Sequence, residues 1–286
     1  MDLFDNPIVL TVALCFGAGL VLAALARGIR IAWIAGLVPA LVFLVAYVAT
    51  YQKVPPFPPV GSVNKVFYIG LGAIILGLIV DLVPRLRPLT ALLGLAVAAA
   101  AVFWIAVPRF NEPDVALYLT IVVLIAGAAL AMWRLAAVAR GTGPNEGALP
   151  AIAMLLVLAL GFAPIALAGG SSSAMMLCLG LAAGIGAAGL VELVLPRGGF
   201  GATAILGATG GLTAVAATVV LISRRADAVA LVLLLPVLVA GQLGGRFLPD
   251  RLSGRPRAIA VGVMTALPLI LVFAVLFLRH PDSFAL

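Results

Sequence analysis

Long apolar stretches alternate with short polar turns along the whole chain. Turns that carry arginine recur near residues 28, 84, 140, 196 and 249. The step between them is about 56 residues, which is close to two membrane crossings of ~20 residues each with their two connecting loops. This spacing predicts a row of helical hairpins that cross a membrane.

The apolar stretches divide into ten segments, each near the ~20 residues that a bilayer crossing needs. We expect these spans near 8–26, 31–51, 66–83, 89–107, 115–133, 148–168, 173–195, 201–222, 228–247 and 258–278. Taken in order, they form hairpins over 8–51, 66–107, 115–168, 173–222 and 228–278. Because the loops are short, the sequence predicts an all-α polytopic membrane protein, with about ten transmembrane helices in five sequential hairpins and no soluble domain.

The composition leads to the same class of protein. Of the 286 residues, 65% are hydrophobic and 9% are charged, and the mean hydropathy is +1.30. Soluble domains carry about 25% charged residues. A pI near 10.3 would suggest a nucleic-acid partner in a soluble protein, but here the basic residues sit in short turns, so we expect no nucleic acid. The expected partners are membrane lipids, together with another membrane protein or a second copy of the chain.

The distribution of basic residues predicts the orientation in the membrane. Of the 17 lysines and arginines, 11 fall in the turns that include Arg27 and Arg85. The opposite turns hold the other six, which are Lys53, Lys65, Arg109, Arg224, Arg225 and Arg279. Short cytoplasmic loops carry the excess of basic residues. We therefore expect a bacterial-type inner-membrane protein with both termini away from the cytoplasm, although Arg224 and Arg225 run against this rule.

One short motif occurs twice. Residues Gly77–Arg85 align without gaps to Gly189–Arg197, and a weaker third copy is Phe247–Arg251. All three copies lie at the same end of an odd-numbered span, which favours a parallel repeat of the hairpin. The alternative is local, since proline after a helix end and arginine at the cytoplasmic interface are both common.

Each of the first two copies places an acid about one turn before an arginine. Asp81 precedes Arg85, and Glu192 precedes Arg197. Ionisable residues within a membrane are costly and often functional. We interpret the two pairs as interfacial ion pairs or as a cytoplasmic gate at the rim of a substrate path.

Prolines near the middle of spans are a second signal. Pro39, Pro164, Pro236 and Pro268 fall within spans 2, 6, 9 and 10. A proline inside a helix removes one hydrogen bond and kinks the chain, and broken helices often mark the binding sites of transporters. Proline is also simply commoner in membrane helices than in soluble ones, so a cavity at these kinks is one of two interpretations.

Small and polar residues gather in spans 7 to 9, which we expect to be the most tightly packed part of the bundle. Thr209 and Thr213 share one helical face, and we expect Gln242 to be the only amide buried in a span. These side chains, with Pro164, Pro236 and Pro268, either line the path of a polar substrate or hold the helices together.

The loop after span 2 is rich in proline. Pro55, Pro56, Phe57, Pro58 and Pro59 follow one another, and such a segment is stiff and extended. It could dock a partner, as proline-rich segments do elsewhere, or form a rigid cover over the bundle.

No motif for catalysis or for a cofactor is found. The single histidine is His280, near the C-terminus, and the two cysteines are Cys15 and Cys178, so clusters that could hold zinc or haem are lacking. We expect no enzyme activity, no metal and no cofactor. Two hypotheses follow: a permease or flippase for a small or lipidic molecule, or a non-catalytic membrane subunit or assembly factor of a larger membrane complex.

Overall fold

The computed structural model describes residues 6–29, 32–112, 114–141, 147–196, 199–249, 252 and 254–284. Within these ranges every regular element is helical, and ten helical spans are long and apolar enough to cross a membrane. The predicted fold class is therefore confirmed: the chain is an all-α polytopic membrane protein. The elements are α1 (Pro7–Ile29), α2 (Ala32–Tyr51), α3 (Ser62–Leu82), η2 (Pro84–Leu89), α4 (Thr90–Ala106), η3 (Val107–Asn111), α5 (Val115–Gly141), α6 (Leu149–Ala168), α7 (Ser172–Val194), η4 (Ala204–Ala208), α8 (Thr209–Ala217), η5 (Thr218–Ser223), α9 (Ala228–Leu234), α10 (Val237–Arg246), α11 (Arg255–Ala266), α12 (Pro268–Arg279) and η6 (Pro281–Ser283).

Three of the ten spans are built from several elements. Span 8 consists of the π-helical segments η4 and η5 on either side of α8. Span 9 is broken into α9 and α10, and span 10 into α11 and α12. The breaks fall at Pro236 and Pro268, as a proline inside a helix would cause. The helices α2 and α6 instead continue past Pro39 and Pro164.

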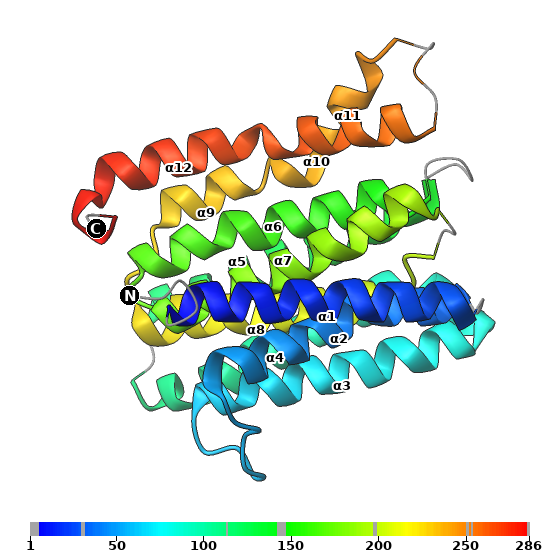
Figure 1. Cartoon of the computed structure of the whole chain (residues 1–286). Coiled ribbons are helices and arrows are strands. Elements are labelled where there is room, and N and C mark those ends of the chain that lie inside the picture. The colour runs from blue at the N-terminus through cyan, green and yellow to red at the C-terminus, as the bar shows by residue number, and fades with distance from the viewer. Residues whose placement is uncertain are drawn as a thin grey trace.

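The helices run back and forth, so that α1 begins at the same end of the bundle at which α12 ends (Figure 1). We call this end the terminal face and the other end the opposite face. The opposite face holds the end of α3, the end of α5 and the start of α6.

The best-buried part of the bundle comprises α6, α7 and span 8. The helix α7 packs most extensively against α1 and α6, whereas span 8 packs against α2, α3 and α4. Helices that follow each other in sequence are thus not always the closest neighbours. The expectation that spans 7 to 9 form the tightest part is wrong for span 9, which lies with span 10 along one side of the bundle, against α6 (Figure 1).

The helix α5 extends to Gly141, well beyond the predicted end at residue 133. Its last turns contain Arg134 and Arg140, which hydropathy alone places outside the membrane. Both side chains bond to main-chain carbonyls: Arg134 Nε donates to Leu238 O at 3.0 Å, and Arg140 Nε donates to Ala136 O at 3.1 Å. Long basic side chains can cover apolar surface while the charge reaches a polar partner, so the helix continues through them.

Candidate functional site

Asp81, the acid in the first copy of the repeated motif, caps the start of span 8. Asp81 is buried at the end of α3. Its carboxylate accepts hydrogen bonds from Ala202 N at 2.8 Å, from Thr203 N at 2.9 Å and from the Thr203 hydroxyl at 2.6 Å. The first N–H groups of a helix lack partners within the helix and attract negative charge. Asp81 therefore acts as a cap supplied by a neighbouring helix.

Glu192, the acid in the second copy of the motif, caps the start of α6 in the same way. Glu192 is fully buried near the end of α7, and it accepts a hydrogen bond from Ala148 N, which precedes α6, at 3.3 Å. It also forms an ion pair with Arg27 at the end of α1. This one side chain thus joins α1, α6 and α7 near the opposite face.

For Asp81, the predicted pairing within its own motif is not what the structure shows. Arg85 is exposed and is not among the partners of Asp81, whose carboxylate is occupied by span 8. Arg197 lies outside the described residues, and the ion pair of Glu192 that the structure describes is with Arg27, 165 positions earlier in the chain. The two motif copies share a local task, which is to close the start of another helix.

The pocket closest to the predicted polar path lies between α5, α6 and the broken spans 9 and 10. Its volume is about 260 Å³, and it opens near the opposite face. It is lined by Ala137, Val138, Gly141, Pro150, Met154, Val237, Leu238, Gly241, Gln242, Gly245, Arg246, Arg257, Val261 and Thr265. We call it the hairpin pocket. Its walls are mostly apolar, and its polar side chains are an amide, a hydroxyl and two guanidinium groups. Among the residues that the structure describes, no acid lines it.

Gln242 lines this pocket, but the expectation that its side chain is buried is wrong. The side chain is exposed, and its amide oxygen accepts a hydrogen bond from Arg134. Arg134 also lies 5.7 Å from the centroid of the Trp133 ring, a cation–π distance. Gln242 is therefore held by the end of α5 and presents its amide at the edge of the pocket.

The breaks in spans 9 and 10 meet α6 at one glycine. A Cβ atom on Gly161 would overlap Leu234 and would lie 2.6 Å from Leu269 Cδ2. Leu234 lies just before Pro236, and Leu269 lies just after Pro268. Pro164 is one helical turn from Gly161, so three of the four prolines predicted near the middle of spans are gathered around one contact with α6. Small residues allow this kind of close approach between membrane helices.

The two threonines do not join Gln242 in one path. Thr209 and Thr213 are buried in α8, and the Thr213 hydroxyl donates to Thr209 O at 2.7 Å. Span 8 packs against α2, α3 and α4, whereas α10 packs against α11, α6 and α5. The predicted path through spans 7 to 9 is therefore wrong as a single unit, and only its span 9 portion borders a pocket that the structure describes.

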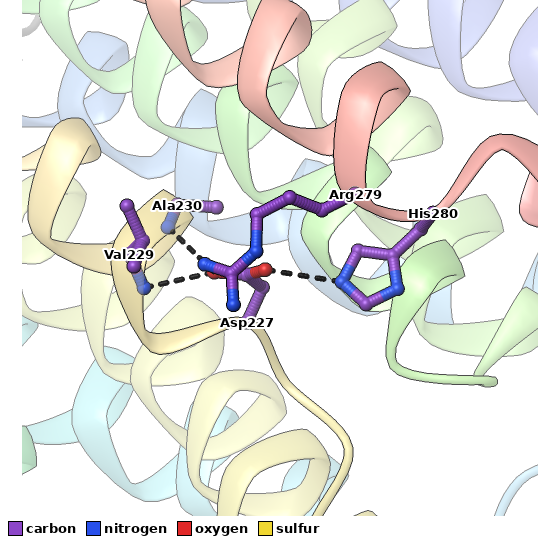
Figure 2. A network of polar contacts seen from close by, with 5 residues as sticks. All are labelled: Asp227, Val229, Ala230, Arg279 and His280. Carbon is purple, nitrogen blue, oxygen red and sulfur yellow. Dashed lines mark hydrogen bonds and ion pairs between the residues drawn. The ribbon is translucent and has the colours of Figure 1, made fainter.

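A polar cluster at the terminal face was missed by the sequence analysis. Asp227 caps the start of α9 by accepting hydrogen bonds from Val229 N at 2.8 Å and Ala230 N at 3.1 Å. It also contacts Arg279 Nη1 at 3.2 Å and His280 Nε2 at 3.0 Å, at the end of α12 (Figure 2). We call these three residues the terminal clasp. The available signal was an aspartate immediately before an apolar run, which is a typical helix N-cap.

The clasp favours the ionised form of Asp227. Burial opposes ionisation, but the hydrogen bonds from Ala230 N, His280 and Val229 N, and the charge of Arg279, outweigh it and hold the pKa of Asp227 below its ordinary value of 3.8. A lowered pKa means that the folded state gains stability above that value and loses it as the pH falls through the folded pKa. The clasp is therefore intact at neutral pH and weakens in acid.

We expect Asp227→Asn to lower the free energy of unfolding by about 1 kcal/mol at neutral pH, because asparagine keeps the cap but loses ion pairs that are partly exposed. Asp227→Ala should cost about 2 kcal/mol, since it also removes the cap. Unfolding curves in detergent measure both values, and the difference between wild type and Asp227→Asn should begin to shrink as the pH falls below 3.8 and vanish below the folded pKa. The control is Asp282→Asn, an exposed acid nearby. A wild-type advantage over Asp227→Asn that persists at low pH would contradict the assignment.

The proline-rich loop is anchored at one end only. Pro55 is buried, and its carbonyl accepts a hydrogen bond from the Tyr68 hydroxyl at 2.8 Å. The Phe57 ring meets the Tyr68 ring at 5.6 Å between centroids, yet Phe57 is 80% exposed. Pro56 and Pro58 are exposed and Pro59 is half-buried. The loop is thus not a cover packed down along its whole length.

Comparison with known proteins gives no match to a protein-family model and no similar curated sequence. The fold defines the class: a polytopic α-helical membrane protein, with ten apolar spans in the part of the chain that the structure describes.

Proposed function

We propose that this protein is a permease or flippase for a small or lipidic molecule, and that the hairpin pocket receives the substrate. One observation carries the proposal: two consecutive spans are both interrupted at proline, with the backbone still in the right-handed helical region there, and the same two spans form one wall of the pocket. Discontinuous helices beside a cavity are a recurring feature of transporter binding sites. Two intact helices would give no reason to expect movement there.

The contacts of spans 9 and 10 differ on the two sides of the breaks. The terminal clasp ties the start of α9 to the end of α12. At the breaks, both spans rest on α6 at Gly161. Beyond the breaks, α10 and α11 pack on each other and against α6, and they line the pocket. Rotation of the α10–α11 pair about the breaks would widen or close the pocket while the clasped halves stay in place.

The pocket lining indicates what kind of molecule it would accept. Met154, Val237 and Val261 offer apolar surface, whereas Gln242 and Thr265 offer hydrogen bonds. Small-molecule sites combine mostly apolar walls with a few polar groups that fix orientation. A neutral or anionic amphipathic molecule suits this lining, because Arg246 lines the pocket and none of its described lining residues is an acid.

We also propose that the protein lies in a bacterial-type inner membrane with the opposite face toward the cytoplasm. Arg87, Arg140 and Arg246 all lie near that face, as the positive-inside rule requires. In this orientation the hairpin pocket opens to the cytoplasm and the terminal clasp lies outside.

Native mass spectrometry of the protein released gently from its own membrane tests the proposal. We expect a lone chain or homo-oligomer that retains a lipid or metabolite, with retention reduced about fivefold in Gln242→Ala because a polar contact of roughly 1 kcal/mol is lost. Thr213→Val is the matched control, since Thr213 is buried in α8 and its hydroxyl bonds only within its own helix. Equal retention by wild type and Gln242→Ala would contradict a substrate in the hairpin pocket.

The second hypothesis, a non-catalytic subunit or assembly factor of a membrane complex, has one observation in its favour. The proline-rich loop exposes Val54, Phe57 and Val60 by 66%, 80% and 88%, and exposed apolar clusters often mark contact sites. A protein partner at fixed stoichiometry in the same mass spectra, lost on Phe57→Ser, would favour this hypothesis over transport.

A further inference from the structure

A second cavity lies on the other side of the end of α5 from the hairpin pocket. It has a volume of about 300 Å³, at the lower end of the range for small-molecule sites, about 300–1,000 Å³. The end of α3, the start of α4, the end of α5 and the start of span 8 enclose it. It therefore lies near the opposite face, where four spans end together.

The charge in this cavity is mainly positive. Two guanidinium groups line it, those of Arg87 and Arg140. Each is held by a main-chain carbonyl: Arg87 Nη2 donates to Asp81 O at 3.0 Å, and Arg140 Nε donates to Ala136 O at 3.1 Å. Among the residues that the structure describes, neither guanidinium has a carboxylate within ion-pair distance. Both are therefore positioned while their charge remains uncompensated.

The one acid in the lining does not cancel this charge. The Asp81 carboxylate is taken up by Ala202 N, Thr203 N and the Thr203 hydroxyl at the start of span 8. The remaining walls come from small or apolar residues, among them Ala136, Phe200 and Ile205. Arg87 and Arg140 are both exposed, so the cavity is open to water at the arginines, and the attraction for an anion comes from the two positioned guanidinium groups.

We propose that this cavity binds a phosphate ester anion between Arg87 and Arg140. Arginine matches phosphate oxygens with two parallel N–H donors, which makes it the residue best suited to this ligand. The two guanidinium groups come from η2 and α5, so the anion would join helices that are far apart in sequence. The ligand chemistry has two sources at this depth: the headgroup of an anionic phospholipid, or a soluble phosphate monoester reaching the opposite face.

Two probes distinguish these sources in the full-length protein. Glycerol 3-phosphate is titrated into the detergent-solubilised protein while its thermal unfolding is followed. Phosphatidylglycerol is offered in nanodiscs of phosphatidylcholine, and the lipids retained are counted by native mass spectrometry. A response to glycerol 3-phosphate indicates a soluble ester, and selective retention of phosphatidylglycerol alone indicates a headgroup; either result supports the site.

Substitutions distinguish binding in this cavity from binding to the general positive charge of the opposite face. Each charged hydrogen bond that is lost should weaken binding by roughly tenfold or more, so we expect Arg87→Gln and Arg140→Gln each to reduce binding and the double variant to abolish it. Arg85→Gln is the matched control, because Arg85 is exposed on the same short helix η2 but does not line the cavity. The single variants guard against misfolding of the double variant.

Two results would overturn the proposal. One is a loss of binding in Arg85→Gln as large as that in Arg87→Gln, which would mean that only the general positive charge of the face matters. The other is binding of neither probe by the folded wild type. The hairpin pocket shares no lining residue with this cavity, so failure of the transport proposal would leave this test unaffected.

Discussion

Replacing Arg27 with alanine is expected to lower the free energy of unfolding by about 3–5 kcal/mol, the cost of leaving a buried charge without its partner. The Glu192 side chain is 1% exposed and that of Arg27 is 10% exposed, so water can reach neither group freely. Glu192 also accepts from Ala148 N at the start of α6. Loss of Arg27 should therefore weaken the junction of α1, α6 and α7, and unfolding of the protein in mixed micelles with increasing denaturing detergent measures the change.

A double variant distinguishes loss of a partner from loss of packing. Arg27→Met combined with Glu192→Gln removes both charges, keeps a side-chain oxygen for Ala148 N and roughly preserves volume. We expect it to recover most of the stability lost in Arg27→Ala, because replacing both members of a buried pair is far less costly than removing one. Arg85→Ala, an exposed arginine, should have almost no effect. An equal loss in Arg27→Ala and Arg85→Ala would show that the pair contributes nothing.

Hydropathy was enough to locate the spans, because the solvent for this chain is the bilayer and each crossing needs a continuous apolar run. The same information could not assign neighbours. Span 8 follows α7 in sequence, yet its packing partners are α2, α3 and α4. Side chains such as Thr209 and Gln242 share a polar character, but polarity does not say which helices face each other. The structure therefore does not bring these side chains together along the predicted path.

The contacts of the two acids could not be assigned from the sequence either. Asp81 and Glu192 were identified because a carboxylate near a membrane boundary is costly. Their partners were sought one turn away, where sequence places Arg85 and Arg197. The structure satisfies Asp81 with the start of span 8 in place of Arg85. Among the described residues, Glu192 contacts Arg27 and the start of α6. Helix starts offer unpaired N–H groups, but which start lies beside which acid depends on the tertiary fold.

Whether a proline interrupts its helix depends on the helices packed around it. Pro236 and Pro268 lie in spans on the side of the bundle, and both helices break there. Pro164 lies in α6, which continues past it among close neighbours on several sides. Packing of the surrounding helices can hold a proline-containing helix together. Sequence therefore indicates where a break is allowed, whereas the bundle decides whether it occurs.

The crossing of α1 and α7 should be the most sensitive packing contact in the protein. These two helices make the most extensive helix contact in the part of the chain that the structure describes. A Cβ atom added to Gly19 would overlap the carbonyl of Gly184 and would lie 2.8 Å from Gly184 Cα. Main-chain atoms cannot rotate away as a flexible side chain can, so the helices themselves would have to separate.

We therefore expect Gly19→Ala to cost about 3 kcal/mol in unfolding free energy, at the upper end of the range for overpacking. Gly17→Ala is the matched control on the same helix, since a Cβ atom there would meet nothing within 4 Å. Unfolding in mixed micelles compares the two variants under the same conditions. Equal stability of Gly19→Ala and Gly17→Ala would mean that α1 and α7 do not cross this closely. A loss confined to Gly19→Ala would establish that close helix approach through small residues, the general means of association in a bilayer, holds α1 against the core of this bundle.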